Sequence, residues 1–298
     1  MITKRQFDLL VLFAEDYSAH ALSQRDIALK TNMSVGSVNS TIKKLNELGY
    51  LEDTKMTAAG YEVLEQYRVK RAVFIAAGFG SRLVPITLNT PKPLVRVNHV
   101  RIIDTMLDAV LSSGIYEIYI VRGYLSEQFD QLLYKYPMIK FIENPAFNES
   151  NNISSAYCAR YLFKNAYILE GDLLLHNPKL ITRYQYESNY LGEYVERTDD
   201  WCFHVDNNYI KKVAIGGLDC YQMYGISYWT EEDGARLVKH IENVYESPGG
   251  KERFWDQVPL EYHINEYKIA VRNCSSKDIV EIDTFSELKA LDQTYEVR

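Results

Sequence analysis

The stretch that decides the fold of this chain is Phe74-Ile75-Ala76-Ala77-Gly78-Phe79-Gly80-Ser81-Arg82-Leu83, followed shortly by Thr90-Pro91-Lys92-Pro93-Leu94. An apolar strand runs here into a turn of small residues, in which glycine lets backbone N–H groups approach an anion closely. The prolines beside Lys92 fix the backbone, so we expect its charge to be aimed at a definite point. The sequence therefore predicts a cradle for the triphosphate of a nucleotide, with Arg82 and Lys92 as the cations beside it.

Two other nucleotide-binding patterns are excluded. No Gly-Lys-Ser/Thr tripeptide occurs in the chain, so it has no P-loop. The dinucleotide fingerprint needs a third glycine at the position of Leu83. The pattern that remains, Ala-Ala-Gly-x-Gly-Ser-Arg-Leu-x-Pro-x-Thr followed by Pro-Lys-Pro-Leu-Val, resembles that of nucleotidyltransferases, which join a nucleoside triphosphate to a phosphorylated small molecule.

Composition favours a globular protein of one large or two smaller domains. Hydrophobic residues make up 47% of the 298 residues, enough for a sizeable core. No apolar run approaches a membrane span, and residues 1–6 lack the apolar core of a signal peptide, so we expect a cytoplasmic protein with no membrane partner. The four cysteines form no Cys-x-x-Cys pair, and we expect them to be reduced and structural. We expect none of the six scattered histidines to be a metal ligand or a catalytic base.

Residues 1–70 are predicted to form a winged helix-turn-helix domain that precedes a domain over residues 71–298. Apolar residues at helical spacing predict helices over residues 7–13, 19–31, 34–48 and 57–67. Ser23 is a predicted N-cap, Gly49 follows the third helix, and residues 50–57 can form a short two-stranded wing. This order of elements resembles the MarR type of winged helix-turn-helix.

The charge of this first domain leaves DNA binding open. Nine Lys and Arg residues balance nine Asp and Glu residues over residues 1–70, whereas phosphate contacts usually require a positive excess. Lys43 and Lys44 nevertheless give the third predicted helix a basic outer face that could enter a major groove. The alternative is a dimerisation or regulatory module, so DNA and a second copy of the chain, in a homodimer, are both candidate partners.

From residue 71 onward, apolar strands alternate with helices. Strands are predicted over residues 71–76, 117–121, 139–142 and 167–169, and helices over residues 102–113, 125–136 and 153–161. This alternation is typical of an α/β fold, a Rossmann-like, mixed but mostly parallel sheet flanked by helices. Ligands of such sheets bind beyond the carboxyl ends of the strands, where the glycine turn lies.

Carboxylates follow two of the predicted strands. Asp172 comes just after the strand over residues 167–169 and can reach a metal ion that lies over phosphates, because Mg²⁺ takes one or two carboxylates plus phosphate oxygens. Glu281 and Asp283 alternate with apolar residues, so on a strand they point to the same face. Alternatively, Asp172 is a turn or capping residue, and Asp283 or Thr284 caps a helix over residues 285–291.

Residues from about 72 to 292 resemble the bacterial CTP:phosphocholine cytidylyltransferases of the Lic type. Besides the glycine turn and Pro91-Lys92, the matching stretches are residues 121–129, 151–155, 225–229, 255–256 and 281–283. The resemblance implies a nucleotidyltransferase fold, a Mg²⁺ cofactor, and the formation of CDP-choline and pyrophosphate from CTP and phosphocholine. One departure is Glu170-Gly171-Asp172, where the pattern of the family has Asp-x-Asp.

The resemblance also assigns roles to residues. It implies that Lys92 and Arg82 are the catalytic cations. The metal ligands implied are Asp172, Glu281 and Asp283, with Glu170 left open. The implied nucleotide-binding residues are Ala76, Ala77, Gly78, Phe79, Gly80, Ser81, Arg82, Asn152 and Ser154.

The acceptor site is predicted from the chemistry of choline. A trimethylammonium group has no conventional N–H donor, so aromatic faces and a carboxylate hold it best. Aromatic residues after Asp172, and one neighbouring acid, are the predicted choline-binding residues: Trp201, Tyr224, Trp229, Trp255 and Asp256. Each aromatic could instead be a core residue. Phosphoethanolamine, 2-aminoethylphosphonate and a sugar phosphate are alternative acceptors, and a DNA-binding regulator that senses CTP or CDP-choline is the alternative function.

Overall fold

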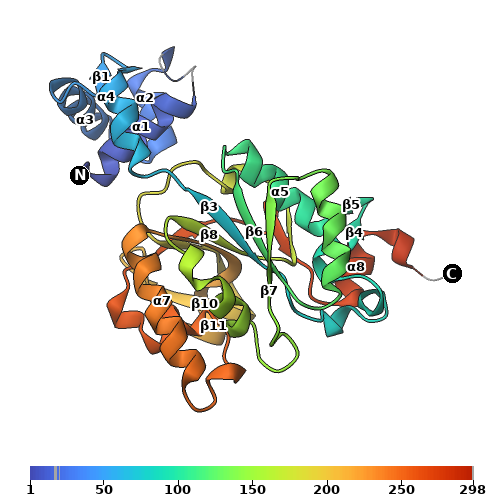
Figure 1. The fold of residues 1–298 in the computed structure, drawn as a ribbon. Helices are drawn as coiled ribbons and strands as arrows, with labels where there is room; N and C mark the ends of the chain where they lie inside the picture. Colours follow the sequence, from blue (N-terminus) through green and yellow to red (C-terminus); the bar gives the residue numbers. More distant parts are fainter. Residues whose placement is uncertain (17–18, 20, 297–298) are drawn as a thin grey trace. The chain divides into compact units, whose positions relative to one another are not determined.

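The computed structural model describes residues 1–16, 19 and 21–296. The chain divides into two compact units (Figure 1), of which the first comprises Met1–Arg68 with Tyr184–Tyr186, and the second comprises Val69–Arg183 with Glu187–Arg298. The short segment Tyr184–Tyr186 joins the first unit because the Tyr186 ring stacks on Tyr67 and its hydroxyl donates to the Ile2 carbonyl. No sequence pattern predicted this return of the chain.

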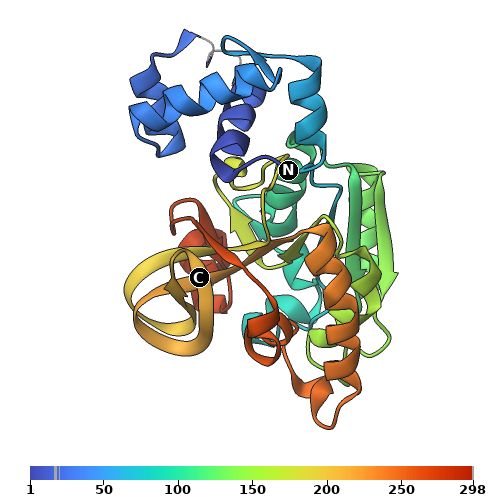
Figure 2. The same cartoon turned by 90° about the vertical axis from the view of Figure 1, so that its left-hand side faces the viewer.

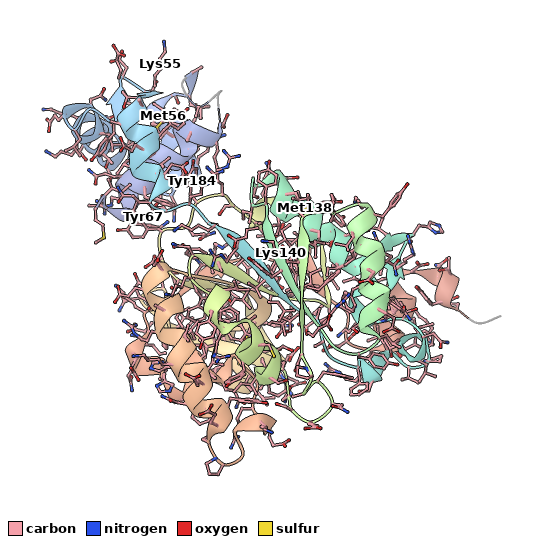
Figure 3. The ribbon with its side chains drawn as sticks, in the orientation of Figure 1. Lys55, Met56, Tyr67, Met138, Lys140 and Tyr184 are labelled. Atoms are coloured by element: carbon pink, nitrogen blue, oxygen red, sulfur yellow. The ribbon has the colours of Figure 1, made fainter. Side chains whose placement is uncertain are left out.

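The first unit has the predicted order of a winged helix-turn-helix. Its elements are α1 (Lys4–Glu15), α2 (Gln24–Thr31), α3 (Val35–Glu47), β1 (Leu51–Glu52), β2 (Lys55–Met56) and α4 (Ala58–Glu65). Lys55 and Met56 lie on the wing (Figure 3), where β2 pairs antiparallel with β1. The helix predicted over residues 19–31 is shorter than expected, because Ser23 and Asp26 form a capping box that starts α2 at Gln24. Residue 20 of that range lies outside the described residues.

The second unit is built on a mixed, mostly parallel sheet, which confirms the predicted fold class. Its seven strands, in spatial order, are β10 (Asn189–Asp206), β12 (Ala270–Asn273), β11 (Tyr209–Trp229), β8 (Ala166–Glu170), β3 (Arg71–Ile75), β6 (Glu117–Arg122) and β7 (Ile139–Glu143). β3 runs parallel to both β6 and β8, whereas β11 pairs antiparallel with β8. Lys140, labelled in Figure 3, lies on β7 at one edge of the sheet, where a charged residue discourages further pairing.

Helices cover both faces of this sheet, which explains why its central strands are almost continuously apolar. Ala72 and Phe74 of β3 pack in a core with α5 (Ile102–Ser112). Val73 and Ile75, on the other face, pack with α6 (Ile153–Ala159) and α7 (Glu231–Glu246). Figure 1 shows α5 and α7 on opposite sides of the sheet.

Shorter elements complete the second unit. They are β4 (Arg96–Val97), β5 (Val100–Arg101), β9 (Leu173–Leu175), β13 (Ile279–Glu281), α8 (Phe285–Leu291), and the short helices η2 (Ser81–Leu83), η3 (Ile86–Leu88), η4 (Lys92–Leu94), η5 (Ser126–Tyr134), η6 (Arg160–Leu162), η7 (Pro178–Leu180), η8 (Gly250–Glu252), η9 (Val258–Tyr262), η10 (Ile264–Glu266) and η11 (Gln293–Tyr295). The segment predicted as a helix over residues 125–136 is the 3₁₀ helix η5, which Leu125 enters in a left-handed conformation with φ of 47°.

A long antiparallel hairpin of β10 and β11 curls away from the rest of the sheet (Figure 2). Its register shifts at several bulges between Tyr190 and Val205, so apolar and polar residues do not alternate regularly along it. For this reason the hairpin could not be predicted from the sequence pattern. Among the described residues, none of the helices has the length and apolar character to span a bilayer.

Candidate active site

A cavity of about 660 Å³ opens beyond the carboxyl ends of β3 and β8. All of the residues predicted to bind the nucleotide line it: Ala76, Ala77, Gly78, Phe79, Gly80, Ser81, Arg82, Asn152 and Ser154. Lys92, Asp172, Glu281 and Asp283 also line it, although they come from distant parts of the chain. The structure thus brings the predicted phosphate cradle and the predicted carboxylates to one place.

The glycine turn is held close to Lys92. Gly80 adopts a left-handed conformation with φ of 63°, and a Cβ atom built on it would lie 3.0 Å from the Cβ of Lys92 and 3.1 Å from Thr87 Cγ2. The Thr87 hydroxyl donates to the Gly80 carbonyl over 2.8 Å. By contrast, a Cβ atom on Gly78 would meet nothing within 4 Å. Glycine is therefore needed at position 80 to form the turn. At position 78 it is needed only to leave space for a ligand in the cavity.

Lys92 is the centre of the charged part of the site. Its Nζ lies 2.8 Å from Asp172 Oδ2 and 2.9 Å from Asp283 Oδ1, and its side chain is only 10% exposed. Burial lowers the pKa of Lys92, but the two carboxylates outweigh burial and raise it above its usual value. Arg82 Nη2 lies 2.7 Å from the same oxygen of Asp283. Lys92 is thus a fixed ammonium ion, and Asp283 aligns both cations.

The carboxylate cluster differs from the set that the sequence suggested. Ligand atoms of Glu170, Asp172 and Glu281 lie within 4.8 Å of one another, so these three carboxylates, rather than the predicted set with Asp283, could hold a metal ion. β13 ends at Glu281, so the alternation of a strand does not extend to Asp283. The backbone N–H of Asp283 instead donates to Glu287, and Thr284 caps α8 in a capping box with that glutamate.

The three carboxyl groups of this cluster repel one another in a buried place. Burial, followed by the nearby acidic groups, raises the pKa of Glu170 and of Glu281 well above the usual value. Asp172 Oδ1 is buried and has no hydrogen-bond partner in the part of the chain that the structure describes. Three converging carboxylates with one unpaired buried oxygen fit a hard divalent cation such as Mg²⁺.

Polar residues, some predicted and some not, brace this region. Asn152 Nδ2 donates to Glu170 over 3.3 Å, and its Oδ1 accepts from the Trp255 backbone over 2.8 Å. Asn144, a buried residue that also lines the cavity, donates to the hydroxyls of Ser154 and Ser155. Sequence reasoning missed Asn144, although its place directly after β7, at the carboxyl edge of the sheet, is a recognisable signal.

Three of the five residues predicted to bind choline lie outside the cavity. Trp229 and Trp255 are 0% and 1% exposed and pack in the core with α7, and neither lines the cavity. Tyr224 is also buried and does not line it, and its hydroxyl donates to Glu193 over 3.2 Å. Tyr224 and Trp229 lie on the carboxyl half of β11, inside the sheet, and Trp255 precedes η9; large aromatic side chains at these places fill the core.

Trp201 does line the cavity, together with Phe254, which was not predicted. The Trp201 ring contacts the Phe254 ring edge to face, with centroids 5.7 Å apart and planes at 69°. Asp200 and Met223 line the cavity as well. A pair of aromatic rings beside a carboxylate suits a small cation.

Asp256 completes the lining as a deeply buried carboxyl group. Burial raises its pKa to about 7, although a hydrogen bond from the Tyr190 hydroxyl opposes the rise. The negative charge of Asp256 also contributes to the raised pKa of Glu170. Asp256 is therefore a buried carboxyl group of the cavity that lies outside the cluster of Glu170, Asp172 and Glu281.

Comparison with known proteins agrees with this geometry. Residues 71–181 match the nucleotidyl transferase family, and residues 20–52 match a winged helix-turn-helix DNA-binding family. A 2-aminoethylphosphonate cytidylyltransferase from Lancefieldella rimae is 36% identical over 228 residues, which cover 75% of this chain and 92% of that protein. The chain belongs to the cytidylyltransferase family.

Other cytidylyltransferases resemble the chain in both sequence and structure. A choline-phosphate cytidylyltransferase from Streptococcus pneumoniae is 29% identical over 227 residues, which cover 75% of this chain and 97% of that protein. The solved structure of a CTP:phosphocholine cytidylyltransferase from the same species covers 77% of this chain and 100% of its own, with a TM-score of 0.70 at 29% identity. The inositol-1-phosphate CTP transferase of T. maritima, at 17% identity and a TM-score of 0.60, shares the fold.

Proposed function

We propose that this cytidylyltransferase transfers CMP from CTP to a small acceptor that carries a phosphonate or phosphate at one end and an amine cation at the other. The observation that carries the proposal is one cavity in which the glycine turn, Lys92, the carboxylate cluster and the Trp201–Phe254 pair meet. The first three suit a triphosphate, and the aromatic pair suits the cationic end of an acceptor.

2-Aminoethylphosphonate is the first candidate acceptor. A primary ammonium group needs oxygen acceptors, and Asp200 and Asp256 both line the cavity. Of the four aromatic residues predicted to hold choline, Trp201 is the one that lines it. The relative with 36% identity is named for this acceptor. Phosphocholine is the second candidate, because a trimethylammonium group binds to aromatic faces such as those of Trp201 and Phe254.

The residues of the site suggest an in-line displacement. An oxygen of the acceptor attacks the α-phosphorus of CTP, the bond from that phosphorus to the bridging oxygen of the β-phosphate breaks, and pyrophosphate leaves. A phosphate monoester is largely dianionic near neutral pH, because its second pKa is about 6, so its attack needs no general base. Lys92 and Arg82 neutralise the charge that grows on the transferred and leaving groups, and the glycine turn orients the triphosphate.

Glu170, Asp172 and Glu281 are the residues that would hold Mg²⁺. The unpaired Asp172 Oδ1 and the raised pKa values of both glutamates support this assignment. A bound Mg²⁺ supplies charge neutralisation at phosphate oxygens.

The test is a panel of pyrophosphate-release assays. Purified protein is incubated with each of the four ribonucleoside triphosphates and with 2-aminoethylphosphonate, phosphocholine, phosphoethanolamine or glucose 1-phosphate. We expect release with CTP alone, and the highest kcat/KM with 2-aminoethylphosphonate. A higher kcat/KM with phosphocholine would favour the second candidate, and no release with any amine-bearing acceptor would reject the proposal.

DNA binding by the first unit is a second candidate function. The match of residues 20–52 supports it, and so does α3, on which Asn39, Ser40, Lys43 and Lys44 are exposed. Fluorescence anisotropy with the DNA upstream of its own gene tests it at several salt concentrations. We expect Lys43→Glu with Lys44→Glu to reduce the affinity and the salt dependence together.

A further inference from the structure

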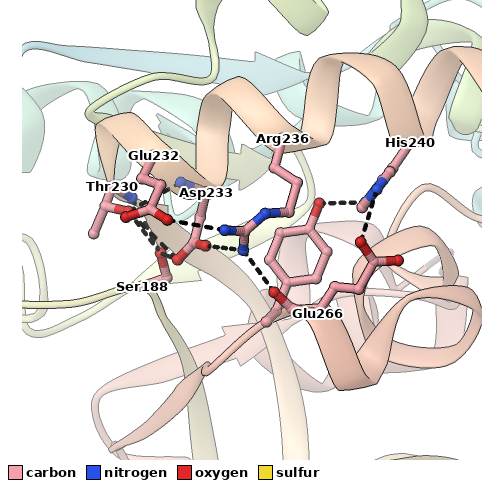
Figure 4. A network of polar contacts seen from close by, with 8 residues as sticks. Ser188, Thr230, Glu232, Asp233, Arg236, His240 and Glu266 are labelled. Atoms are coloured by element: carbon pink, nitrogen blue, oxygen red, sulfur yellow. Dashed lines mark hydrogen bonds and ion pairs between the residues drawn. The ribbon is translucent and has the colours of Figure 1, made fainter.

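Two histidines and a glutamate meet where α7 faces η10. His240 lies on α7, and His263 and Glu266 lie at the two ends of η10. Figure 4 shows His240 and Glu266 of this group. Their side chains are 12%, 22% and 53% exposed, so the group is open to solvent on the side of the glutamate. None of the three lines the active-site cavity, and the function proposed above does not use them.

The three side chains converge through atoms that can bind a metal ion. Glu266 Oε1 lies 2.7 Å from His263 Nδ1, and its Oε2 lies 3.4 Å from His240 Nε2. One ligand atom of each residue lies within 4.8 Å of the other two. Two imidazole nitrogens and one carboxylate form a set that binds Zn²⁺ and other late first-row divalent cations, with water at the remaining position.

Neighbouring residues hold two of these ligands in place. The Tyr267 hydroxyl lies 2.8 Å from His240 Nδ1, so an Nδ1–H that donates to it leaves the Nε2 lone pair available. Arg236, one turn earlier on α7, donates to the backbone carbonyl of Glu266 and to Asp233, as the dashed lines in Figure 4 show. α7 and the end of η10 are therefore joined before any ion binds.

The orientation of the two histidines decides how they can bind one ion. The two imidazole rings are stacked, with centroids 3.6 Å apart and planes at 7°. One ion cannot lie in the planes of two parallel rings, so binding requires a ring to tilt. His263 is the more exposed of the two, at 22% against 12%, so we expect its ring to tilt.

We propose that His240, His263 and Glu266 bind one divalent transition-metal ion, represented by Zn²⁺, at a site separate from the active-site carboxylates. This assignment departs from the expectation that none of the histidines binds a metal. η9, which leads into η10, begins two residues after Asp256 of the cavity wall. The ion therefore clamps α7 to the segment that continues from that wall, and it stabilises the folded protein by binding to it.

The experiment uses the full-length protein after removal of metals with EDTA. In saturating Mg²⁺, which occupies hard carboxylate sites, the protein is titrated with Co²⁺ and followed by its visible d–d absorption, and with Zn²⁺ by calorimetry. We expect one equivalent to bind to the wild type. His240→Gln and His263→Gln should each weaken binding at least about tenfold, and Tyr267→Phe, which removes the partner of His240, about tenfold.

Two control variants make the test decisive. His176→Gln removes an exposed histidine outside the cluster, and Asp172→Asn removes a carboxylate of the active site. Both should retain the Co²⁺ band. Equal affinity in the wild type, His240→Gln and His263→Gln would overturn the proposal, as would loss of the band in Asp172→Asn. Pyrophosphate release by the histidine variants shows that they are folded.

Discussion

Lys92 Nζ lies 2.8 Å from Asp172 Oδ2, and this ion pair joins the glycine turn to the carboxylate cluster. The two oxygens of Asp172 have different environments, because Oδ2 binds the lysine and Oδ1 is buried without a hydrogen-bond partner among the described residues. A cation at Oδ1 and the ammonium group at Oδ2 would then lie on either side of one carboxylate. The ion pair therefore couples the position of the Lys92 ammonium group to the binding of a cation by the carboxylate cluster.

Lys92→Ala tests the catalytic part of this pair. Loss of a fixed cation beside the triphosphate should lower kcat by about 10²–10³-fold, the effect of removing one preorganised electrostatic group. Steady-state pyrophosphate release measures kcat, and circular dichroism checks that the variant is folded. Turnover near that of the wild type would exclude Lys92 from the transition state.

Asp172→Asn tests the metal-binding part. Because Asp172 belongs to the carboxylate cluster, the variant should need at least about tenfold more Mg²⁺ for half-maximal activity, and Glu170→Gln should behave in the same way. Asp283→Asn is the matched control. Asp283 pairs with Lys92 and Arg82, so its variant should lower kcat with a smaller change in the Mg²⁺ requirement. A larger increase in the Mg²⁺ requirement for Asp283→Asn than for Glu170→Gln would favour the metal ligands predicted from the sequence.

Gly80→Ala and Gly78→Ala should separate stability from nucleotide binding. Gly80 has φ of 63°, and a Cβ atom there would lie only 3.0 Å from the Cβ of Lys92, so alanine should cost about 1–2 kcal/mol of unfolding free energy, measured by urea denaturation. Alanine at Gly78 meets nothing within 4 Å and should leave stability unchanged. It should raise KM for CTP, because Gly78 lines the cavity and the added methyl group takes up space there. Equal loss of stability in both variants would contradict this explanation.

Asp256 should make stability depend on pH. Its pKa is raised by burial from 3.8 to about 7, so the folded protein holds a proton that the unfolded chain has released over this range. The free energy of unfolding should therefore fall as the pH rises from about 4 to about 7. Asp256→Asn, which can still accept from Tyr190, should show a smaller fall in urea denaturation without metal. Glu170 and Glu281 act in the same direction, and Asp256 adds to the raised pKa of Glu170, so the difference between the two curves reports Asp256 together with its effect on Glu170.

Phe254→Ala should weaken binding of the acceptor and leave KM for CTP unchanged. The ring pairs with Trp201 at the cavity, so KM for a cationic acceptor should rise several-fold, and more for phosphocholine than for 2-aminoethylphosphonate. Tyr262→Ala is the control, since Tyr262 is 44% exposed but does not line the cavity. An unchanged KM for both acceptors would remove the aromatic pair from the acceptor site.

The donor side of the site was predictable because its signal is local in sequence. Gly78, Gly80, Arg82 and Lys92 lie within fifteen residues of one another, and the geometry of one turn and two prolines fixes them. The acceptor side was not, because Trp201 and Phe254 are brought together by a hairpin and a loop with no repeating pattern.

Patterns in neighbouring residues are weaker guides where an element ends between them. Alternation over residues 279–284 predicted that Glu281 and Asp283 would point to one face of a strand, but the strand ends at Glu281 and Thr284 begins the capping box of α8; both acids nevertheless line the cavity. Similarly, Trp255 and Asp256 are adjacent in sequence, yet only Asp256 lines the cavity, because successive side chains point in different directions.

The place of Tyr184–Tyr186 in the first unit has a practical consequence for dissecting the protein. The chain enters or leaves that unit three times, after Arg68, after Arg183 and after Tyr186. A fragment cut near residue 70 would lack the ring that stacks on Tyr67, and its complement would carry Tyr184 and Tyr186 without their packing partners. Neither fragment would keep the packing that its residues have in the whole chain, so the proposed transferase and DNA-binding activities are best measured on the intact polypeptide.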